Sequence, residues 1–192
     1  HGLDVVRARI AGAGGDPDRI RLVAVTKGFG PEVVRAARQA GLVDIGESYV
    51  QELVAKVVDL EADEERTAWP RWHMIGRLQR NKVRKAAPHV ALWHSVDRLS
   101  LGAEIARRAP GAAVLVQANV AGEDGKGGCT PAMAPALVDG LRDLGLDVQG
   151  VMTVPPEGPA EQARPVFEQA RELTERLGLA ELSIGMSGDL EV

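Results

Sequence analysis

The sequence predicts an α/β protein in which helices cover a parallel β-sheet. Short apolar runs of strand length alternate along the chain with stretches whose apolar residues recur every three or four positions. The alternation continues from the first strand, near residue 22, almost to residue 192. Because a strand, a helix and a second strand in succession usually form a parallel pair, this alternation favours a parallel sheet with helices outside it.

Each expected strand is a mostly apolar run between turn or helix signals. The run 113–120 is the clearest, and 22–26 is typical of a strand buried on both faces. The expected strands are 22–26, 43–46, 72–76, 91–96, 113–120, 148–154 and 182–186.

Each expected helix has one apolar face, and several have a recognisable start or end. Apolar residues in 33–40 recur at i, i+3, i+4 and i+7, and Gly41 ends that helix. Asp97 is expected to be an N-cap, and Pro88 ends the preceding helix. The expected helices are an opening one around 3–10, then 33–40, 50–57, 81–87, 97–108, 133–144 and 163–177.

Two architectures agree with this pattern, a doubly wound open sheet and an eight-stranded (β/α) barrel. A barrel needs an eighth strand, and the sequence stops at Val192, just after the seventh. If the chain is a barrel, we therefore expect the eighth strand to be missing from this sequence, which would leave two sheet edges unpaired. The residues alone leave the two architectures open.

Composition limits the class of protein. With 192 residues, 45% of them hydrophobic, we expect one soluble domain over 1–192. No apolar run is long enough to span a membrane, and a net charge of −4 with interspersed acids and bases argues against a nucleic-acid surface. Cys129 is the only cysteine, so no disulfide forms within the chain and a reducing, cytoplasmic location is expected.

Lys27 ends the first buried strand, and Gly28 follows it directly. An amine held where a buried strand opens into a loop can lose its proton more easily than one in water, and can then attack a carbonyl group. Strands also end in lysine simply because the charge reaches solvent. Lys27 is therefore a candidate nucleophile on position, with a solvated surface lysine as the alternative.

The segment Ser187-Gly188-Asp189 follows the seventh strand. Free backbone N–H groups at such a turn, with the Ser187 hydroxyl beside them, can bind an anion, and Asp189 could begin a helix. In (β/α) barrels, phosphate groups often bind after the seventh and eighth strands. A plain capping turn is the alternative.

Three other residues have chemistry to consider. His73 lies in the strand 72–76 and could contact a ligand, although a core histidine with a protein partner is the commoner case, and the same holds for His94. No spacing of His, Cys, Asp and Glu suggests a metal site. Cys129 has no evident base nearby, which argues against nucleophilic catalysis by this thiol.

Six motifs spread from residue 22 to the end of the chain resemble those of the pyridoxal phosphate homeostasis protein family, which is related to the barrel domain of alanine racemase. They include long stretches such as Trp-His-Met-Ile-Gly-Arg-Leu-Gln-Arg-Asn-Lys. The motifs lie at 23–27, 45–52, 72–82, 94–99, 150–154 and 182–189. The resemblance thus extends over nearly the whole chain.

The resemblance implies a single (β/α)8 barrel of the alanine racemase N-terminal type that binds pyridoxal 5′-phosphate (PLP). It implies a Schiff base on Lys27 and a phosphate site at Ser187 and the Gly188 backbone. Ser48 stands where the family commonly has Asn beside the cofactor, and Gly28-Phe29 replaces a more usual polar pair. The expected PLP contacts are Lys27, Ser48, His73, Met74, Ser187 and Gly188.

The implied function is that of a PLP carrier or buffer in intracellular PLP homeostasis, without a catalytic turnover. Expected partners are PLP itself and PLP-dependent apo-enzymes, with no nucleic acid or membrane, and the chain is expected to be a monomer. The alternative is a PLP-dependent amino-acid racemase. Racemases of the related fold use a tyrosine from a second domain, whereas this chain has one tyrosine, Tyr49, within a motif of its own.

Overall fold

The computed structural model describes residues 2–62 and 70–192. In these residues seven strands form one parallel sheet in the order β1-β2-β3-β4-β5-β6-β7. The strands are β1 (Ala24–Val25), β2 (Asp44–Glu47), β3 (Arg71–Met74), β4 (Val90–Val96), β5 (Ala113–Gln117), β6 (Asp147–Met152) and β7 (Glu181–Ser183).

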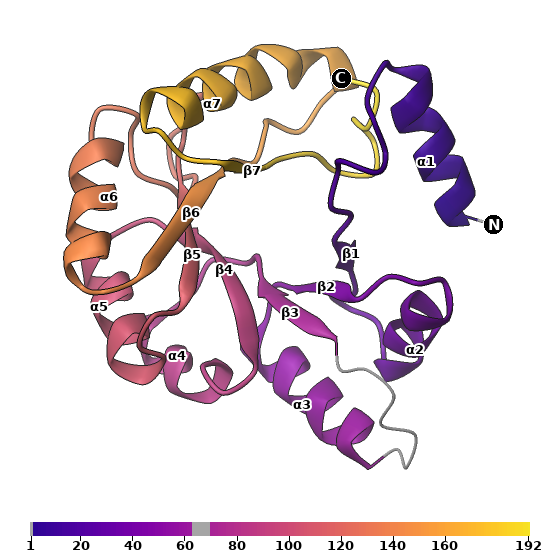
Figure 1. Ribbon diagram of the computed structural model, residues 1–192, viewed down its shortest axis with the longest axis horizontal. Helices are drawn as coiled ribbons and strands as arrows, with labels where there is room; N and C mark the ends of the chain where they lie inside the picture. Colours follow the sequence, from indigo (N-terminus) through magenta and orange to yellow (C-terminus); the bar gives the residue numbers. More distant parts are fainter. Residues whose placement is uncertain (1, 63–69) are drawn as a thin grey trace.

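Helices connect successive strands and cover the outside of the sheet (Figure 1). They are α1 (Gly2–Gly12), α2 (Pro31–Gln39), α3 (Val50–Glu61), α4 (Arg80–Ala86), α5 (Leu99–Arg108), α6 (Ala134–Asp143) and α7 (Arg164–Arg176), with a short 3-10 turn, η1 (Ala160–Gln162), before α7. None of the helices in the described ranges is long and apolar enough to cross a membrane.

The strand order separates the two architectures that the sequence left open. Every strand pairs with its neighbours in the sequence, whereas a doubly wound sheet reverses its strand order at a switch point. The sheet curls around an axis and leaves a gap between β1 and β7 (Figure 1). This is the expected barrel geometry with seven strands in the described residues, in which β1 and β7 do not pair with each other.

The main core lies between the sheet and the helices. Ile45, Met74 and Trp93 point outward from neighbouring strands and belong to one buried apolar cluster with Leu53 of α3 and Leu101 of α5. A smaller cluster is formed by Leu92, Leu115 and Met152. Since Leu92 and Trp93 are adjacent in β4, strand alternation places this smaller cluster on the inner face of the sheet.

The two edge strands are shorter than the sequence predicted. β1 contains only Ala24–Val25 of the expected 22–26, and β7 ends at Ser183 instead of continuing to 186. Each of them pairs on one side only, so fewer ladder hydrogen bonds hold its ends, and the Val25 side chain is 46% exposed. The run 22–26, whose composition is typical of a strand buried on both faces, therefore belongs to an edge strand.

The expected cap of α5 is also different. Arg98, not Asp97, is the N-cap residue, and its side chain makes no capping hydrogen bond. The Asp97 carboxylate instead accepts a hydrogen bond from the Arg98 guanidinium. Short polar side chains are common at N-caps because they accept hydrogen bonds from the first backbone N–H groups of a helix. Here the Asp97 carboxylate binds the Arg98 guanidinium instead.

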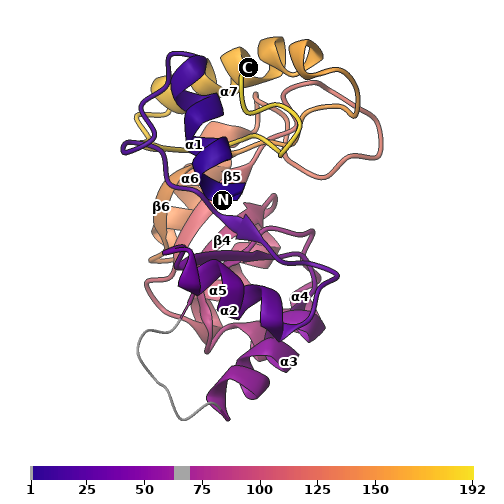
Figure 2. The ribbon, with the colours of Figure 1, turned by 90° about the vertical axis from the view of Figure 1, so that its right-hand side faces the viewer.

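α1 lies beside the C-terminal segment in both views of the ribbon (Figures 1 and 2). The Arg9 guanidinium forms an ion pair with Glu191 and donates a hydrogen bond to the carbonyl oxygen of Ser187 at 3.1 Å. The helix that opens the chain thus holds the segment that follows β7, although 178 residues separate Arg9 from Ser187.

Candidate functional site

Lys27 lies in a tight turn directly after β1. The Phe29 N–H donates to the Thr26 carbonyl oxygen at 3.1 Å, which closes a four-residue turn from Thr26 to Phe29. Gly28, at the third position, has a φ of +78°, which is the left-handed conformation that a type II turn requires there. The Lys27 side chain is exposed, and strand alternation turns it away from the side chain of Thr26, whose hydroxyl contacts Glu47 of β2.

A buried ion pair between α3 and β2 supports this turn. The Lys56 ammonium of α3 is 3% exposed, pairs with the Glu47 carboxylate and donates to the Thr26 carbonyl oxygen at 2.6 Å. The Thr26 hydroxyl donates to the same carboxylate at 2.5 Å. Glu52 of α3 accepts a hydrogen bond from the Gly28 N–H at 2.7 Å. The backbone on both sides of Lys27 is therefore fixed while its amine remains in solvent.

Sequence reasoning missed Lys56 and Glu47 as supports of the turn. Lys56 is 30 residues from Thr26 and lies in an ordinary amphipathic helix, where a lysine usually faces solvent. The one signal in the sequence is Glu52, four residues before Lys56, which is the spacing of a helical ion pair.

Ser48 follows β2 and is partly buried, next to the loop that follows β3. A Cβ atom added at Gly76 would lie 2.2 Å from the Ser48 carbonyl oxygen and 2.6 Å from its Cα atom. The two loops therefore approach so closely that only glycine fits at position 76. This contact fixes the Ser48 backbone at the carboxyl end of β2, on the same rim of the barrel as Lys27.

Ser187 and Gly188 are exposed and lie in a turn after β7, on this same rim. The Asp189 N–H donates to the Met186 carbonyl oxygen at 3.2 Å, while the buried Asp189 carboxylate accepts from the Met186 N–H. No partner for the N–H groups of Ser187 and Gly188 is found among residues 2–62 and 70–192. Both residues are exposed, and a Cβ atom built at Gly188 meets nothing within 4 Å, so the turn is open to solvent.

One detail of the expected anion site is wrong. Asp189 does not begin a helix: residues 187–192 form turns, and its side chain closes the turn that carries Ser187 and Gly188. Asp and Asn often bond to nearby backbone N–H groups in this way, which competes with N-capping. The free N–H groups thus belong to a side-chain-stabilised turn instead of a helix start.

The side chains of His73 and Met74 are both buried within the fold. Met74 is 0% exposed, and its side chain belongs to the core between the sheet and the helices. His73 is 2% exposed, and both of its ring nitrogens have protein partners, Asp44 and His94, at 2.8 Å each. The geometry therefore supports a structural role for both side chains, which was the alternative considered for His73.

His73 is the middle of a buried hydrogen-bond chain that joins β2, β3, β4 and β7. The Asp44 carboxylate contacts His73 Nε2, His73 Nδ1 contacts His94 Nε2, and His94 Nδ1 contacts the Ser183 hydroxyl at 2.9 Å. An ionised carboxylate only accepts hydrogen bonds, so with neutral rings each histidine carries its proton on Nε2. The Ser183 hydroxyl then donates to His94, so each of these hydrogen bonds has one defined donor and one defined acceptor.

Burial controls the ionisation of this chain. Burial lowers the pKa of His94 to about 3, helped by the charges of His73 and Arg21. Burial also lowers the pKa of His73, although the Asp44 carboxylate opposes the shift. For Asp44 itself burial acts to raise the pKa, but hydrogen bonds from Arg71 and His73 outweigh it and hold that pKa below its ordinary value.

Two sequence-based exclusions can be compared with the structure. Cys129 is buried, and burial raises the pKa of its thiol to about 11, which disfavours the thiolate that nucleophilic chemistry needs. In the described parts of the chain no group of three or more His, Cys, Asp or Glu side chains is arranged to hold a metal ion.

Comparison with known proteins relates this geometry to a family. The family model for the alanine racemase N-terminal domain matches residues 5–191. A pyridoxal phosphate homeostasis protein of Pseudomonas aeruginosa is 40% identical over 97% of this chain and 82% of its own length. One from Aquifex aeolicus is 38% identical, over 99% of this chain and 86% of its own length.

Solved structures agree with these matches. PipY of Synechococcus elongatus, solved with PLP bound, superposes with a TM-score of 0.80 at 31% identity, covering 96% of this chain and 90% of its own. Alanine racemase of Clostridium difficile superposes with a TM-score of 0.72 at 14% identity, covering 98% of this chain and 51% of its own. The second likeness shows the fold alone.

Proposed function

The chain belongs to the pyridoxal phosphate homeostasis protein family, within the alanine racemase N-terminal domain family, and we propose from this that it binds PLP on Lys27 as an intracellular carrier. The observation that carries the proposal is an exposed amine, on a turn that a buried ion pair fixes, sharing one rim with two unpartnered backbone N–H groups.

The groups present at this rim fit the cofactor. PLP supplies an aldehyde, which condenses reversibly with an amine and releases water, and a phosphate, which needs hydrogen-bond donors. Lys27 provides the exposed amine, while the Ser187 hydroxyl and the N–H groups of Ser187 and Gly188 provide donors on an exposed turn. Ser48, held by its contact with Gly76, is the remaining polar side chain that we assign to the cofactor from this rim.

A carrier explains the geometry better than a racemase does. Racemisation requires a second base placed opposite the lysine, across the substrate. Tyr49 is the only tyrosine, and its side chain is 59% exposed at the start of α3. We therefore propose that the chain acts without turnover as a monomer in the cytoplasm, over a single domain of residues 1–192, and transfers PLP to apo-enzymes.

The test is an absorption spectrum after PLP is added, followed by borohydride reduction and peptide mapping by mass. We expect a visible imine band and a reduced adduct on the Lys27 peptide. Lys27→Arg should remove both, because arginine keeps the charge but does not form an imine under these conditions. Lys85→Arg, which alters another exposed lysine, is the matched control and should keep both signals.

Two results would contradict the proposal. An adduct that persists at another lysine in the K27R variant would place the cofactor elsewhere. Exchange of an amino-acid α-proton with solvent deuterium at a useful rate would favour the racemase instead, and this exchange should be lost in K27R if the same amine is responsible.

A further inference from the structure

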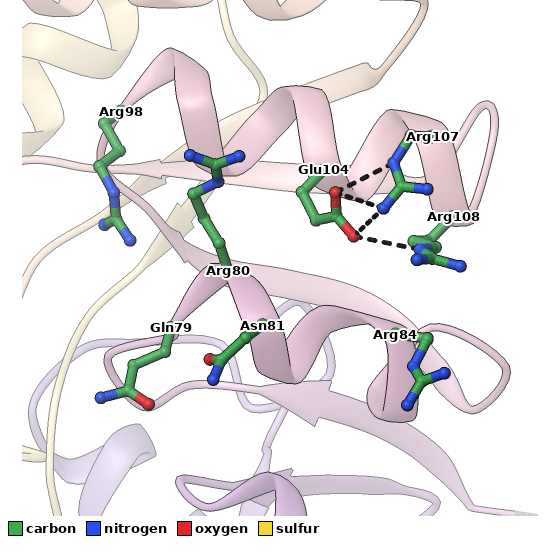
Figure 3. Close-up of a pocket in the computed structure, with 8 residues that line it drawn as sticks. All are labelled: Gln79, Arg80, Asn81, Arg84, Arg98, Glu104, Arg107 and Arg108. Carbon is green, nitrogen blue, oxygen red and sulfur yellow. Dashed lines mark hydrogen bonds and ion pairs between the residues drawn. The ribbon is translucent and has the colours of Figure 1, made fainter.

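An arginine-rich groove runs between α4 and α5 on the outer wall of the barrel (Figure 3). Its volume is about 630 Å³, and all of its lining residues are polar or charged. They include five arginines and one acid: Arg80, Arg84, Arg98, Arg107, Arg108 and Glu104. We call this feature the arginine groove. One end of it lies at the loops after β3 and β4, but none of its lining residues is assigned to PLP, and it plays no part in the function proposed above.

Protein partners hold three of the five guanidinium groups in place. Arg98 binds the Asp97 carboxylate and donates to the Leu78 carbonyl oxygen at 3.1 Å. Arg107 and Arg108 both bind Glu104, at 2.6 Å and 3.0 Å. These arginines lose little further freedom when an anion arrives, because they are already ordered.

The other two arginines have no counterion in the described structure. Neither Arg80 nor Arg84 forms an ion pair or a side-chain hydrogen bond with any residue of 2–62 or 70–192. They are four residues apart on α4, where like charges destabilise a helix. Figure 3 shows Arg80 reaching from α4 toward α5, with its guanidinium between Arg98 and Glu104. Arg84 extends to the side away from α5 in the same view, so of the two it is Arg80 that reaches between the helices.

The concentration of positive charge contrasts with the rest of the molecule. The whole chain has a net charge of −4, yet within the described residues the five arginines of the groove have only two carboxylate partners, Glu104 and the neighbouring Asp97. Guanidinium groups bind phosphate and carboxylate through paired, parallel hydrogen bonds, which favours a ligand with several such groups.

The size and lining of the groove limit the ligand further. About 630 Å³ is within the range of small-molecule sites. The seven-residue α4 is about 10 Å long, which is short for a nucleic-acid track. None of the lining residues is aromatic, so the groove offers no ring on which a base could stack. The geometry points to a binding site for a small anion that carries several phosphate groups.

The experiment is a calorimetric titration of the protein with sodium tripolyphosphate at low ionic strength. The protein is first loaded with PLP and reduced with borohydride, so that the anion cannot occupy the PLP phosphate site. We expect binding at one site that weakens as salt is added, because exposed charges are screened.

Variants locate the site. The double variant Arg80→Ala with Arg84→Ala should weaken binding about tenfold or more. The matched control is Arg142→Ala with Arg171→Ala, which removes two exposed charges from α6 and α7 and should leave the affinity nearly unchanged. Replacing Arg80 and Arg84 by lysine should give an intermediate affinity, because the charge remains and the paired hydrogen bonds are lost.

Further titrations separate the sources of the phosphate groups. Equal affinity for adenosine triphosphate and tripolyphosphate would show that the phosphates alone are recognised, and tighter nucleotide binding would show that the nucleoside also makes contact; both support the site. Three results would overturn it: no binding at low salt, equal weakening by both double variants, or binding only to oligonucleotides with an affinity that grows with their length. None of them bears on the Lys27 adduct.

Discussion

The two buried histidines link the stability of the fold to pH. In the unfolded chain a histidine has a pKa of about 6.5, whereas burial lowers the pKa of His94 to about 3 and that of His73 as well. Between these values the unfolded chain binds protons that the folded chain does not. Stability is therefore fully present above about pH 6.5 and decreases as the pH falls toward 3.

Urea unfolding at several pH values between 7 and 4 measures this effect. Each histidine that is neutral when folded and charged when unfolded contributes a slope of roughly 1.4 kcal/mol per pH unit. His94→Gln should reduce the slope by about one such contribution, because glutamine does not titrate. His89→Gln removes a histidine outside the buried chain and is the control; an unchanged slope in the His94 variant would contradict the assignment.

Single positions also show what the sequence could and could not predict. Lys27 and Ser187 were predicted as site residues because each follows an apolar strand, and the structure places both after the strands expected, at the rim where the ends of parallel strands meet. Lys56 was not identified, because its contact with Thr26 depends on how α3 packs against β1. Met74 was expected at the cofactor because its motif resembles the family's, yet strand alternation turns its side chain outward into the core.

At the scale of elements, the contact between the loops after β2 and β3 is the most sensitive to change. Gly76→Ala places a Cβ atom 2.2 Å from the Ser48 carbonyl oxygen, which is backbone and cannot rotate away. We expect a loss of about 1–3 kcal/mol in the free energy of unfolding, typical of overpacking. PLP affinity should fall too, because Ser48 must shift.

Denaturant unfolding and PLP titration check this expectation together. Gly12→Ala is the matched control, since a Cβ atom at this position in α1 meets nothing within 4 Å. A Gly76→Ala protein with normal stability and normal PLP affinity would show that the loops separate without cost and that Ser48 is not held by this contact.

The elements themselves were largely predictable, and their edges were not. All seven strands were expected near their observed positions, because apolar runs and helical periodicity are local signals. β1 and β7 are short because each has a neighbouring strand on one side only. Which strands lie at an edge is a property of the whole sheet, so it cannot be predicted from one short run of residues. The same holds for the arginine groove, because its arginines are spread over 80–108 and only the packing of α4 against α5 gathers them.

For the whole molecule, we expect the contact between α1 and the segment after β7 to affect the proposed site. Arg9 of α1 holds Glu191 and the Ser187 carbonyl oxygen. Arg9→Ala should weaken PLP binding a few-fold, because the turn with the phosphate donors becomes less ordered, and should hardly change the melting temperature, since exposed ion pairs contribute little.

PLP titration and thermal unfolding of the same samples provide the measurement. Arg164→Ala breaks another exposed ion pair, with Glu161, away from this contact and is the control. Equal PLP affinity in the Arg9 and Arg164 variants would mean that the turn orders itself without α1. A large drop in melting temperature for the Arg9 variant alone would mean that α1 supports the fold more than the site.

The exposure of Lys27 has a consequence for how long PLP would stay bound. A buried ion pair fixes the backbone of its turn, while its amine faces solvent in the described residues. An imine in that position would be within reach of free amines and thiols, as well as of a lysine on another protein. The time that PLP stays bound would then depend on the concentration of competing nucleophiles around the protein.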